Sequence, residues 1–496
     1  MIRNKAILLL FIVFLSSCVV GPDYKKPDVS TPSYKKIPKK YKEAPKGWKY
    51  AQPNDHCSRG EWWKVFHDDT LNKLESKVKI GNQTIAVAEA QLRQAQALVD
   101  QARASYFPTI ASSLSLTRAN QVLFGSSGAG TTVSTPGSTV NTGGAATGGA
   151  SSGPFTNEFL LLTASWEPDL WGSVRRTVAA NVAGAKASEA QLALAQLSAQ
   201  ASLAQYYFEL AALDKDQILL DNTVKNYKKI LSFTENQYHS GVASKSDVIQ
   251  ARSQWEAMQA QAINNGILRG QYEHAIAVLM GEPPANFSLD FKNRVMRTPK
   301  IPLELPSSLL ERRPDIAQAE RLMAQANEQI GIAIAAYYPS LALSVSGTLG
   351  GRGPLNTIIS NPTAGWSLGP QLSETIYDGG LRGATVSAAR ASYDASIASY
   401  RQTVLTAFQE VEDNLLALTK LKQQEKVLNA AAKDARQALD LMIKQYKAGT
   451  VPYTNVITAQ SNAYTAEKSA VDVTGLTMTA SVALIKSLGG GWESSQ

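Results

Sequence analysis

The residues best suited to metal or thiol chemistry in this chain are few and scattered. They are two cysteines and four histidines: Cys18, Cys57, His56, His67, His239 and His274. Zinc sites bring their ligands together in closely spaced pairs, and here only His56 and Cys57 are adjacent. Because no second pair accompanies them, we interpret the two as an exposed loop pair. We expect neither a metal site nor a disulfide scaffold.

Carboxylates offer a second kind of chemistry, general acid–base catalysis. Glu410, Glu412 and Asp413 lie close together in a long helical stretch, where solvated side chains on a wall of helices are the more typical explanation. The sequence also lacks the phosphate-binding pattern G-x-x-x-x-G-K-[ST] and the zinc pattern H-E-x-x-H. We therefore expect no enzyme activity and no cofactor.

The chemistry that the sequence does indicate is lipid attachment at Cys18. Residues 1–17 have a basic start, an apolar stretch and the ending Leu15-Ser16-Ser17, as in a secretory signal peptide. An aliphatic residue three positions before a cysteine, with small residues between, resembles the bacterial lipoprotein box, in which the cysteine is acylated, for example with palmitate, and becomes the N-terminus. The alternative is a plain signal peptide cleaved nearby. Valine rather than aspartate at position 19 resembles the sorting pattern for the outer membrane.

Charge and hydropathy exclude further classes. The net charge of +8 falls to +6 when Arg3 and Lys5 leave with the signal peptide, and the basic residues are spread singly apart from a cluster between Lys25 and Lys49. This distribution argues against nucleic-acid binding. No apolar run of about 20 residues follows the leader, so we expect no membrane-spanning helix. Residues 21–53 are rich in Pro, Lys and Tyr, which predicts an extended tether.

The elements that must position these residues occur twice in the chain. Residues 237–251 match residues 445–459 at identical spacing, and residues 104–109 match residues 335–340. Self-similarity of this kind indicates a tandem internal duplication.

Each half contains two segments in which apolar and polar residues alternate with period two. The four segments are 109–117, 160–167, 340–349 and 366–373. Each is about ten residues long, the length that a tilted strand needs to cross a bilayer. A soluble sandwich would show the same alternation. The long polar connections at 125–153 and 350–362 favour the outer loops of a membrane barrel instead.

Long proline-free helices account for most of the remainder. Residues 175–237 and 382–445 span 63 and 64 residues, and at 1.5 Å per residue each reaches roughly 95 Å. Shorter helices, which in stacked pairs match one long helix in height, are expected at 82–104, 245–280, 315–336 and 454–487. Alanine and glutamine dominate them, so that the helices can pack closely in a wall. An ordinary coiled coil is the alternative.

Four strands cannot close into a barrel alone. Within lipid every strand edge must be paired, because no water is available to free N–H and C=O groups. Two copies give eight strands and a filled interior, whereas three give twelve and an open lumen. The expected fold is therefore an α+β membrane protein, a trimeric 12-stranded β-barrel with four strands per subunit, continued by a long α-helical barrel.

Together these features resemble the TolC-like outer-membrane factor family, in its lipoprotein branch that serves RND-type multidrug efflux pumps. The resemblance runs from Cys18 to about Leu488. Besides the lipoprotein box, the duplicated strand pairs and the two Tyr-x-x-Gly turns, it is based on Gly21-Pro22-Asp23-Tyr24, Leu170-Trp171-Gly172 and Glu311-Arg312-Arg313-Pro314-Asp315-Ile316. It implies a homotrimer anchored to outer-membrane lipid, with a helical extension into the periplasm and a mixed equatorial region.

On this scheme the chain divides into consecutive parts. They are a signal peptide at 1–17, a lipid-anchored tether and equatorial segment at 18–70, a first repeat of two strands plus a helical hairpin at 71–281, an equatorial linker at 282–314, a second such repeat at 315–488 and a tail at 489–496.

The resemblance also implies partners and a gate. The channel passively conducts drugs or other small molecules delivered by an inner-membrane RND-type pump through a periplasmic membrane-fusion adaptor protein. The adaptor docks at the two hairpin turns, whose residues include Tyr238, Gly241, Ser244, Asp247, Tyr446, Gly449, Thr450 and Asn455. Ile443 and Thr458 stand where family members often carry an aspartate, so that Asp440 and Asp247 are the candidates for a periplasmic gate.

Two other functions remain open at this point. One is an outer-membrane channel for type I protein secretion, which the sequence does not exclude. The other is a lipid-anchored periplasmic coiled-coil spacer without a pore. A spacer would explain the lipoprotein box and the rods but not four strands of bilayer length.

Overall fold

The structure is a computed structural model that describes residues 19–26, 42, 60–119, 134–135, 138–139, 155–292, 296, 298–299, 313–352 and 363–490. Its contacts divide the chain into two units, one with the strands and one with most of the helices. Each unit takes segments from both halves of the sequence. The duplicated halves therefore do not form one unit each.

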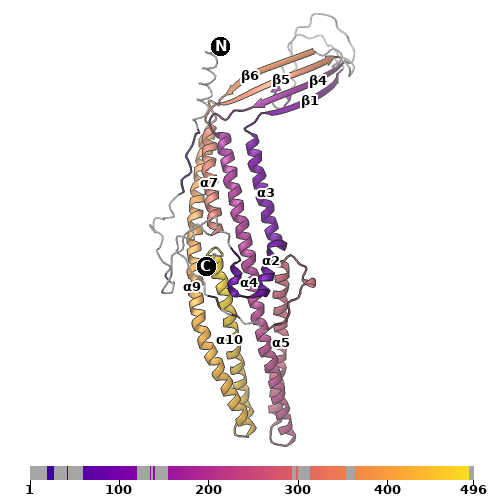
Figure 1. The fold of residues 1–496 in the computed structure, drawn as a ribbon, viewed down its shortest axis with the longest axis vertical. Coiled ribbons are helices and arrows are strands. Elements are labelled where there is room, and N and C mark those ends of the chain that lie inside the picture. Colours follow the sequence, from indigo (N-terminus) through magenta and orange to yellow (C-terminus); the bar gives the residue numbers. More distant parts are fainter. Residues whose placement is uncertain are drawn as a thin grey trace. The chain divides into compact units, whose positions relative to one another are not determined.

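The helices occur in pairs of equal length, one from each half of the chain (Figure 1). The long pair has 67 residues each, the middle pair 35 and the shortest pair 22. These are α4 (Ser173–His239) and α9 (Leu381–Lys447), α5 (Lys245–Leu279) and α10 (Tyr453–Ser487), and α3 (Gln83–Ala104) and α7 (Pro314–Ala335). The predicted helices are confirmed, with ends that differ by one or two residues.

The strands form a four-stranded antiparallel sheet in the order β1-β4-β5-β6. Their bounds are β1 (Thr109–Ala119), β4 (Phe155–Trp166), β5 (Ser340–Arg352) and β6 (Thr363–Ser373). The register places residues of one kind opposite each other. Ile110, Ala164, Val345 and Leu368 make one row across all four strands, whereas the row next to it is Ala111, Thr163, Ser346 and Ser367.

This register gives the sheet one apolar and one polar face. The large apolar side chains of the first face are exposed, including Trp366 at 85%, Ile110 at 72% and Leu368 at 68%. Hydroxyl groups pair on the other face, where the Oγ atoms of Ser346 and Ser367 lie 2.8 Å apart. Contiguous exposed apolar surface of this kind marks a site of contact with a partner or a membrane.

Several short elements were not predicted. They are the 3-10 helices η1 (Trp62–Phe66) and η2 (Pro284–Asn286), helix α2 (Asp69–Gly81), and the two-residue strands β2 (Ser134–Thr135) and β3 (Ser138–Thr139). Helix α2 begins after Asp68, whose carboxylate accepts hydrogen bonds from the backbone N–H groups of Thr70 and Leu71. This cap stabilises the start of α2.

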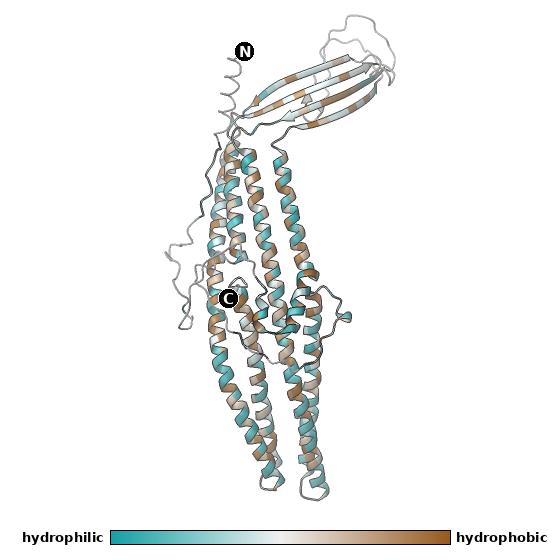
Figure 2. Cartoon of the chain, in the orientation of Figure 1, coloured by the Kyte–Doolittle hydropathy of each residue, from teal (hydrophilic) through white to brown (hydrophobic). Residues whose placement is uncertain are grey.

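The largest hydrophobic core lies where η1 and α2 pack against α4, α5 and α10. Phe66 and Phe208 have ring centroids 4.7 Å apart, and the Tyr207 hydroxyl donates to Asp68 over 2.6 Å. Figure 2 shows hydrophilic and hydrophobic residues alternating along the helices. Within the described part of the chain, none of the helices has the length and apolar run needed to cross a bilayer.

One acidic residue lies inside this region of the core without a partner. Glu75 of α2 is 0% exposed, and neither of its carboxylate oxygens has a hydrogen-bond partner among the described residues. Burial raises the pKa of Glu75 well above its ordinary value. The folded protein therefore holds this proton more tightly than the unfolded chain, and stability falls as pH rises from about 4.3, the ordinary pKa, through the folded-state pKa.

We expect Glu75→Gln to remove this pH dependence, because the amide cannot ionise. At pH 8 the variant should be more stable than the parent by about 1 kcal/mol or more, whereas at pH 4 the two should be similar. Thermal unfolding at the two pH values measures the difference. Glu89→Gln on the exposed face of α3 is the control and should keep the parent's pH dependence. Equal pH dependence in the parent and Glu75→Gln would contradict the assignment.

Candidate functional site

The predicted lipid attachment site, Cys18, lies outside the described residues, but the chain directly after it is held in place. The Val20 N–H donates to the Trp171 carbonyl over 3.1 Å, and Arg176 Nη2 donates to the Gly21 carbonyl over 3.1 Å. Gly21 has φ +102°, and a Cβ there would lie 2.6 Å from Gly331 Cα. Only glycine fits this crossing, which explains the first residue of the Gly21-Pro22-Asp23-Tyr24 motif.

The remaining residues of this motif contact helices α7 and α9. The Asn327 Nδ2 donates to the Pro22 carbonyl over 3.1 Å, and Lys26 Nζ lies 2.8 Å from Glu320 Oε2. Tyr24 packs against a buried cluster that includes Met323 and Tyr400. The segment that follows the expected anchor is therefore bound to the helices through backbone, aromatic and ionic contacts.

The two hairpin turns have the same backbone geometry. Gly241 and Gly449 both have φ +74°. The N–H after each glycine returns to the carbonyl five residues earlier, Val242 to Gln237 over 2.8 Å and Thr450 to Gln445 over 3.1 Å. A left-handed glycine directly after a helix closes its last turn in this way.

Most of the predicted docking residues at these turns are exposed to solvent. Gly241, Ser244, Gly449, Thr450 and Asn455 are exposed, and Tyr238 is 41% exposed. Asp247 forms a capping box at the start of α5. Its N–H donates to the Ser244 hydroxyl over 3.2 Å, and its carboxylate accepts from the Ser244 N–H over 3.1 Å. The Asp247 side chain thus stabilises the turn.

Tyr446 differs from its counterpart Tyr238, because it is buried. Its exposed fraction is 7%, its hydroxyl lies 3.2 Å from Thr234 Oγ1, and its ring centroid lies 5.4 Å from that of Tyr453. Burial raises the pKa of Tyr446. The Tyr446 side chain joins the α4–α5 hairpin to the α9–α10 hairpin.

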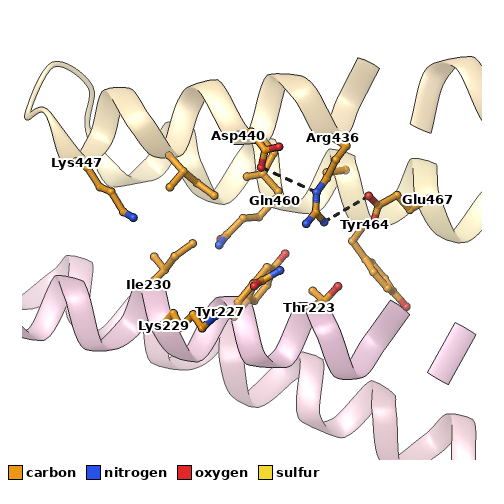
Figure 3. Close-up of a pocket in the computed structure, with 14 residues that line it drawn as sticks. Thr223, Tyr227, Lys229, Ile230, Arg436, Asp440, Lys447, Gln460, Tyr464 and Glu467 are labelled. Atoms are coloured by element: carbon orange, nitrogen blue, oxygen red, sulfur yellow. Dashed lines mark hydrogen bonds and ion pairs between the residues drawn. The ribbon is translucent and has the colours of Figure 1, made fainter. Parts of the chain in front are cut away.

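Charged residues make one further contact between the two hairpins and a cluster within the α9–α10 hairpin. Lys468 Nζ of α10 lies 3.5 Å from Asp216 Oδ2 of α4 and 2.8 Å from Asp472 Oδ1. Asp440, one of the gate candidates, has an oxygen 4.0 Å from Arg436 Nε (Figure 3). Arg436 Nη1 also lies 3.4 Å from Glu467 Oε1. The structure therefore places Asp440 in a charged cluster and Asp247 in a helix cap, and does not bring the two together.

The carboxylates Glu410 and Glu412, interpreted as solvated, both have partners. Glu410 Oε2 lies 2.8 Å from Arg313 Nη1, and Glu412 accepts from the Lys42 N–H over 2.6 Å. Arg313 is 7% exposed, and it also contacts Asp315 and the Ser487 carbonyl. The sequence signal for this cluster was the Arg-Pro-Asp motif at 313–315. No group of three His, Cys, Asp or Glu residues able to hold a metal occurs among the described residues, and His56 and Cys57 lie outside them.

We expect Gly241→Ala to destabilise the protein by about 1 kcal/mol, because alanine is strained at positive φ. No atom lies within 4 Å of the new Cβ, so the cost is conformational only. Gly266→Ala is the matched change inside α5, where the Cβ also meets no atom within 4 Å. It should stabilise by about 0.5–1 kcal/mol, since alanine favours the helix. Thermal unfolding checks both, and shifts of the same sign would contradict the comparison.

The chain is similar to known outer-membrane proteins over most of its length. It matches the family described as Outer membrane efflux protein over residues 74–282 and 305–490. The pyoverdine export outer membrane protein OpmQ of Pseudomonas aeruginosa is 30% identical over 459 residues, 91% of this chain and 92% of OpmQ. The probable efflux pump outer membrane protein TtgC of Pseudomonas putida is 27% identical over 498 residues, 99% and 96% of the two chains. The solved structure of the outer-membrane channel OprN has a TM-score of 0.79 and 29% identity, with 96% of this chain and 100% of that chain covered.

Proposed function

We propose that this chain, which belongs to the outer membrane efflux protein family, is the outer-membrane channel of a tripartite efflux system. The family is one of outer-membrane efflux proteins and not of enzymes. The channel conducts drugs or other small molecules passively to the exterior, and an inner-membrane RND-type pump delivers them through a periplasmic membrane-fusion adaptor. The observation that carries this proposal is the exposed apolar face of the four-stranded sheet.

Three copies of the sheet complete a barrel. Strands β1 and β6 stand at the two ends of the strand order, so each has one side without a neighbour in the described sheet. In lipid these edges must be paired, and β6 of one subunit can pair with β1 of the next. Twelve strands then enclose a lumen lined by the polar face, while the apolar face contacts lipid.

Exposed aliphatic residues on two helices support the same assembly. Ile249 and Ile263 of α5 are 14 residues apart, as are Val427 and Leu441 of α9, and all four are more than half exposed. Fourteen residues are two heptads, so each pair lies on one stripe of a coiled coil. These stripes provide surfaces on which the hairpins of neighbouring subunits pack into a helical barrel.

The protein lies in the outer membrane, and we propose that acyl chains on Cys18 hold its N-terminus there. The lipoprotein box supports this anchor, and so do the contacts that bind residues 19–26 to the protein directly after it. Each buried acyl methylene contributes about 0.8 kcal/mol, so several chains give a firm attachment. Cys18→Ala should abolish incorporation of radiolabelled palmitate, and unchanged labelling would disprove the site.

For adaptor docking we propose the exposed residues of the two hairpin turns, and for the periplasmic gate Asp440. The exposed Tyr238 and Val242 give the first turn an apolar surface for a partner. Asp440 lines a pocket whose walls come from both hairpins. Its contact with Arg436, four residues earlier on α9, is 4.0 Å long and therefore weak.

The relatives favour small molecules as cargo. OpmQ is named for the export of pyoverdine, and TtgC is named as part of a probable efflux pump. Secretion of proteins by a type I system is the second candidate, but neither OpmQ nor TtgC is named for it. A spacer without a pore does not explain the exposed apolar face of the sheet.

Conductance of the purified protein in a planar bilayer tests the proposed function. We expect discrete current steps, together with a crosslinked mass of three chains in detergent. A spacer would give no steps. A stable monomer that stays soluble without detergent after removal of its anchor would contradict both the pore and the trimer.

A further inference from the structure

We propose that a pocket between α4 and the α9–α10 hairpin binds a small aromatic carboxylate. The pocket has a volume of about 190 Å³. Figure 3 shows its lining side chains between the helices of the two hairpins. A cavity of about 150 Å³ is large enough for benzene, so an aromatic ring that bears one carboxylate matches the size of this pocket.

Gln460 is the residue that points to a ligand. Its side chain is 2% exposed, and neither its amide oxygen nor its amide nitrogen has a hydrogen-bond partner among the described residues. Gln460 lines the pocket, and Figure 3 shows its amide extending from α10 toward α4, beside Arg436. Buried amides in folded proteins are almost always hydrogen-bonded. This amide therefore offers a donor and an acceptor to a molecule in the pocket.

The charges around the pocket favour an anion. Its lining contains three cations, Lys229, Arg436 and Lys447, and two carboxylates, Asp440 and Glu467. The contacts of Arg436 with these carboxylates are 3.4 and 4.0 Å, longer than the 2.7–2.9 Å of close charge-assisted pairs. The guanidinium can therefore offer its planar pair of N–H groups to the carboxylate of a ligand.

The remaining walls favour an aromatic group over a hydrated inorganic ion. Ile230, Leu439 and Ile443 are apolar, and Tyr227 and Tyr464 contribute rings. Burial raises the pKa of Tyr464 to about 12, so its hydroxyl stays protonated and can donate a hydrogen bond. Apolar walls give no hydrogen bonds to a hydrated ion, whereas they pack against a ring.

A ligand in this pocket contacts both hairpins, because its walls come from α4 as well as from α9 and α10. Anything that binds only one arrangement of the hairpins stabilises that arrangement. In the channel, bound carboxylate then favours the arrangement of the two hairpins that this structure shows. This consequence depends on the proposed function, but the binding site itself does not.

Calorimetric titration of the full chain in detergent with sodium benzoate tests the site. We expect saturable binding of one benzoate per chain and at least tenfold weaker binding of benzyl alcohol, which has the ring without the charge. The absence of saturable heat would show a pocket that holds water only. Equal binding of the two probes would show an apolar cavity without recognition of the carboxylate. Either result overturns the proposal.

Variants identify the pocket as the place of binding. Gln460→Leu and Lys229→Met should each weaken benzoate binding at least fivefold, and Lys229 is exposed, so that its change leaves the fold intact. Arg252→Met is the control, because Arg252 is paired with Glu235 and does not line the pocket. Unchanged affinity in both pocket variants would overturn the assignment. Planar-bilayer current with benzoate added to the periplasmic side then tests whether the bound ligand changes conduction. An unchanged current would contradict the effect on the channel but not the binding site.

Discussion

We expect Leu368→Arg to abolish assembly of the protein in the outer membrane. Leu368 is the middle residue of β6 and is 68% exposed on the apolar face, in the row that contains Ile110 and Val345. An arginine that faces lipid at this depth costs about 2–4 kcal/mol in each subunit. Because the proposed trimer carries three such residues, the loss should leave little assembled protein. Heat-resistant trimer in the outer-membrane fraction is the quantity to measure.

Ser367→Arg is the matched control for this change. Ser367 is the neighbouring residue, but it lies on the polar face opposite Ser346. In the proposed barrel an arginine there faces the water of the lumen, so assembly should persist while the single-channel current changes. Normal assembly of Leu368→Arg, or equal loss in both variants, would show that the apolar face does not contact lipid.

The strands could be predicted from the sequence because their information is local. Alternation with period two identifies the two faces within one segment, and a slip of one residue would place Leu368 among serines. The pattern thus fixes which residues share a face, although a slip of two residues would keep the same faces and the exact register comes from the structure. The bounds of the helices could also be predicted from the sequence, since Gly241 and Gly449 mark the ends of α4 and α9.

The contacts of the candidate site were much harder to predict from the sequence, because they join residues far apart in the chain. Tyr238 and Tyr446 occupy matching positions in the two repeats, yet one is exposed and the other is buried against Thr234. Repetition in sequence predicts equal local structure, but burial depends on which helix lies opposite. The sequence did not single out Gln460 either. Its amide lacks hydrogen-bond partners because of the residues that surround it in space, and these come from distant parts of the chain.

We expect Arg269→Met to lower the free energy of unfolding by about 3–5 kcal/mol, as found when one partner of a buried ion pair is removed. Arg269 of α5 donates from Nε to Asp214 Oδ1 over 2.7 Å, and the side chain of Asp214 is fully buried. Arg269 also donates from Nη2 to the Leu289 carbonyl over 2.7 Å. Without the guanidinium, the buried carboxylate loses an opposite charge and the segment after α5 loses an attachment.

Arg252→Met on the same helix separates this effect from the general loss of a positive charge. Arg252 pairs with Glu235 over 3.2 Å, and the two side chains are 57% and 37% exposed, so its removal should cost less than about 1 kcal/mol. Thermal unfolding gives the stability difference. Limited proteolysis around Leu289 should proceed faster in Arg269→Met only, because the Leu289 carbonyl has lost its donor while the Leu289 N–H keeps its bond to Glu273. If both variants unfold alike, the buried pair does not hold this segment.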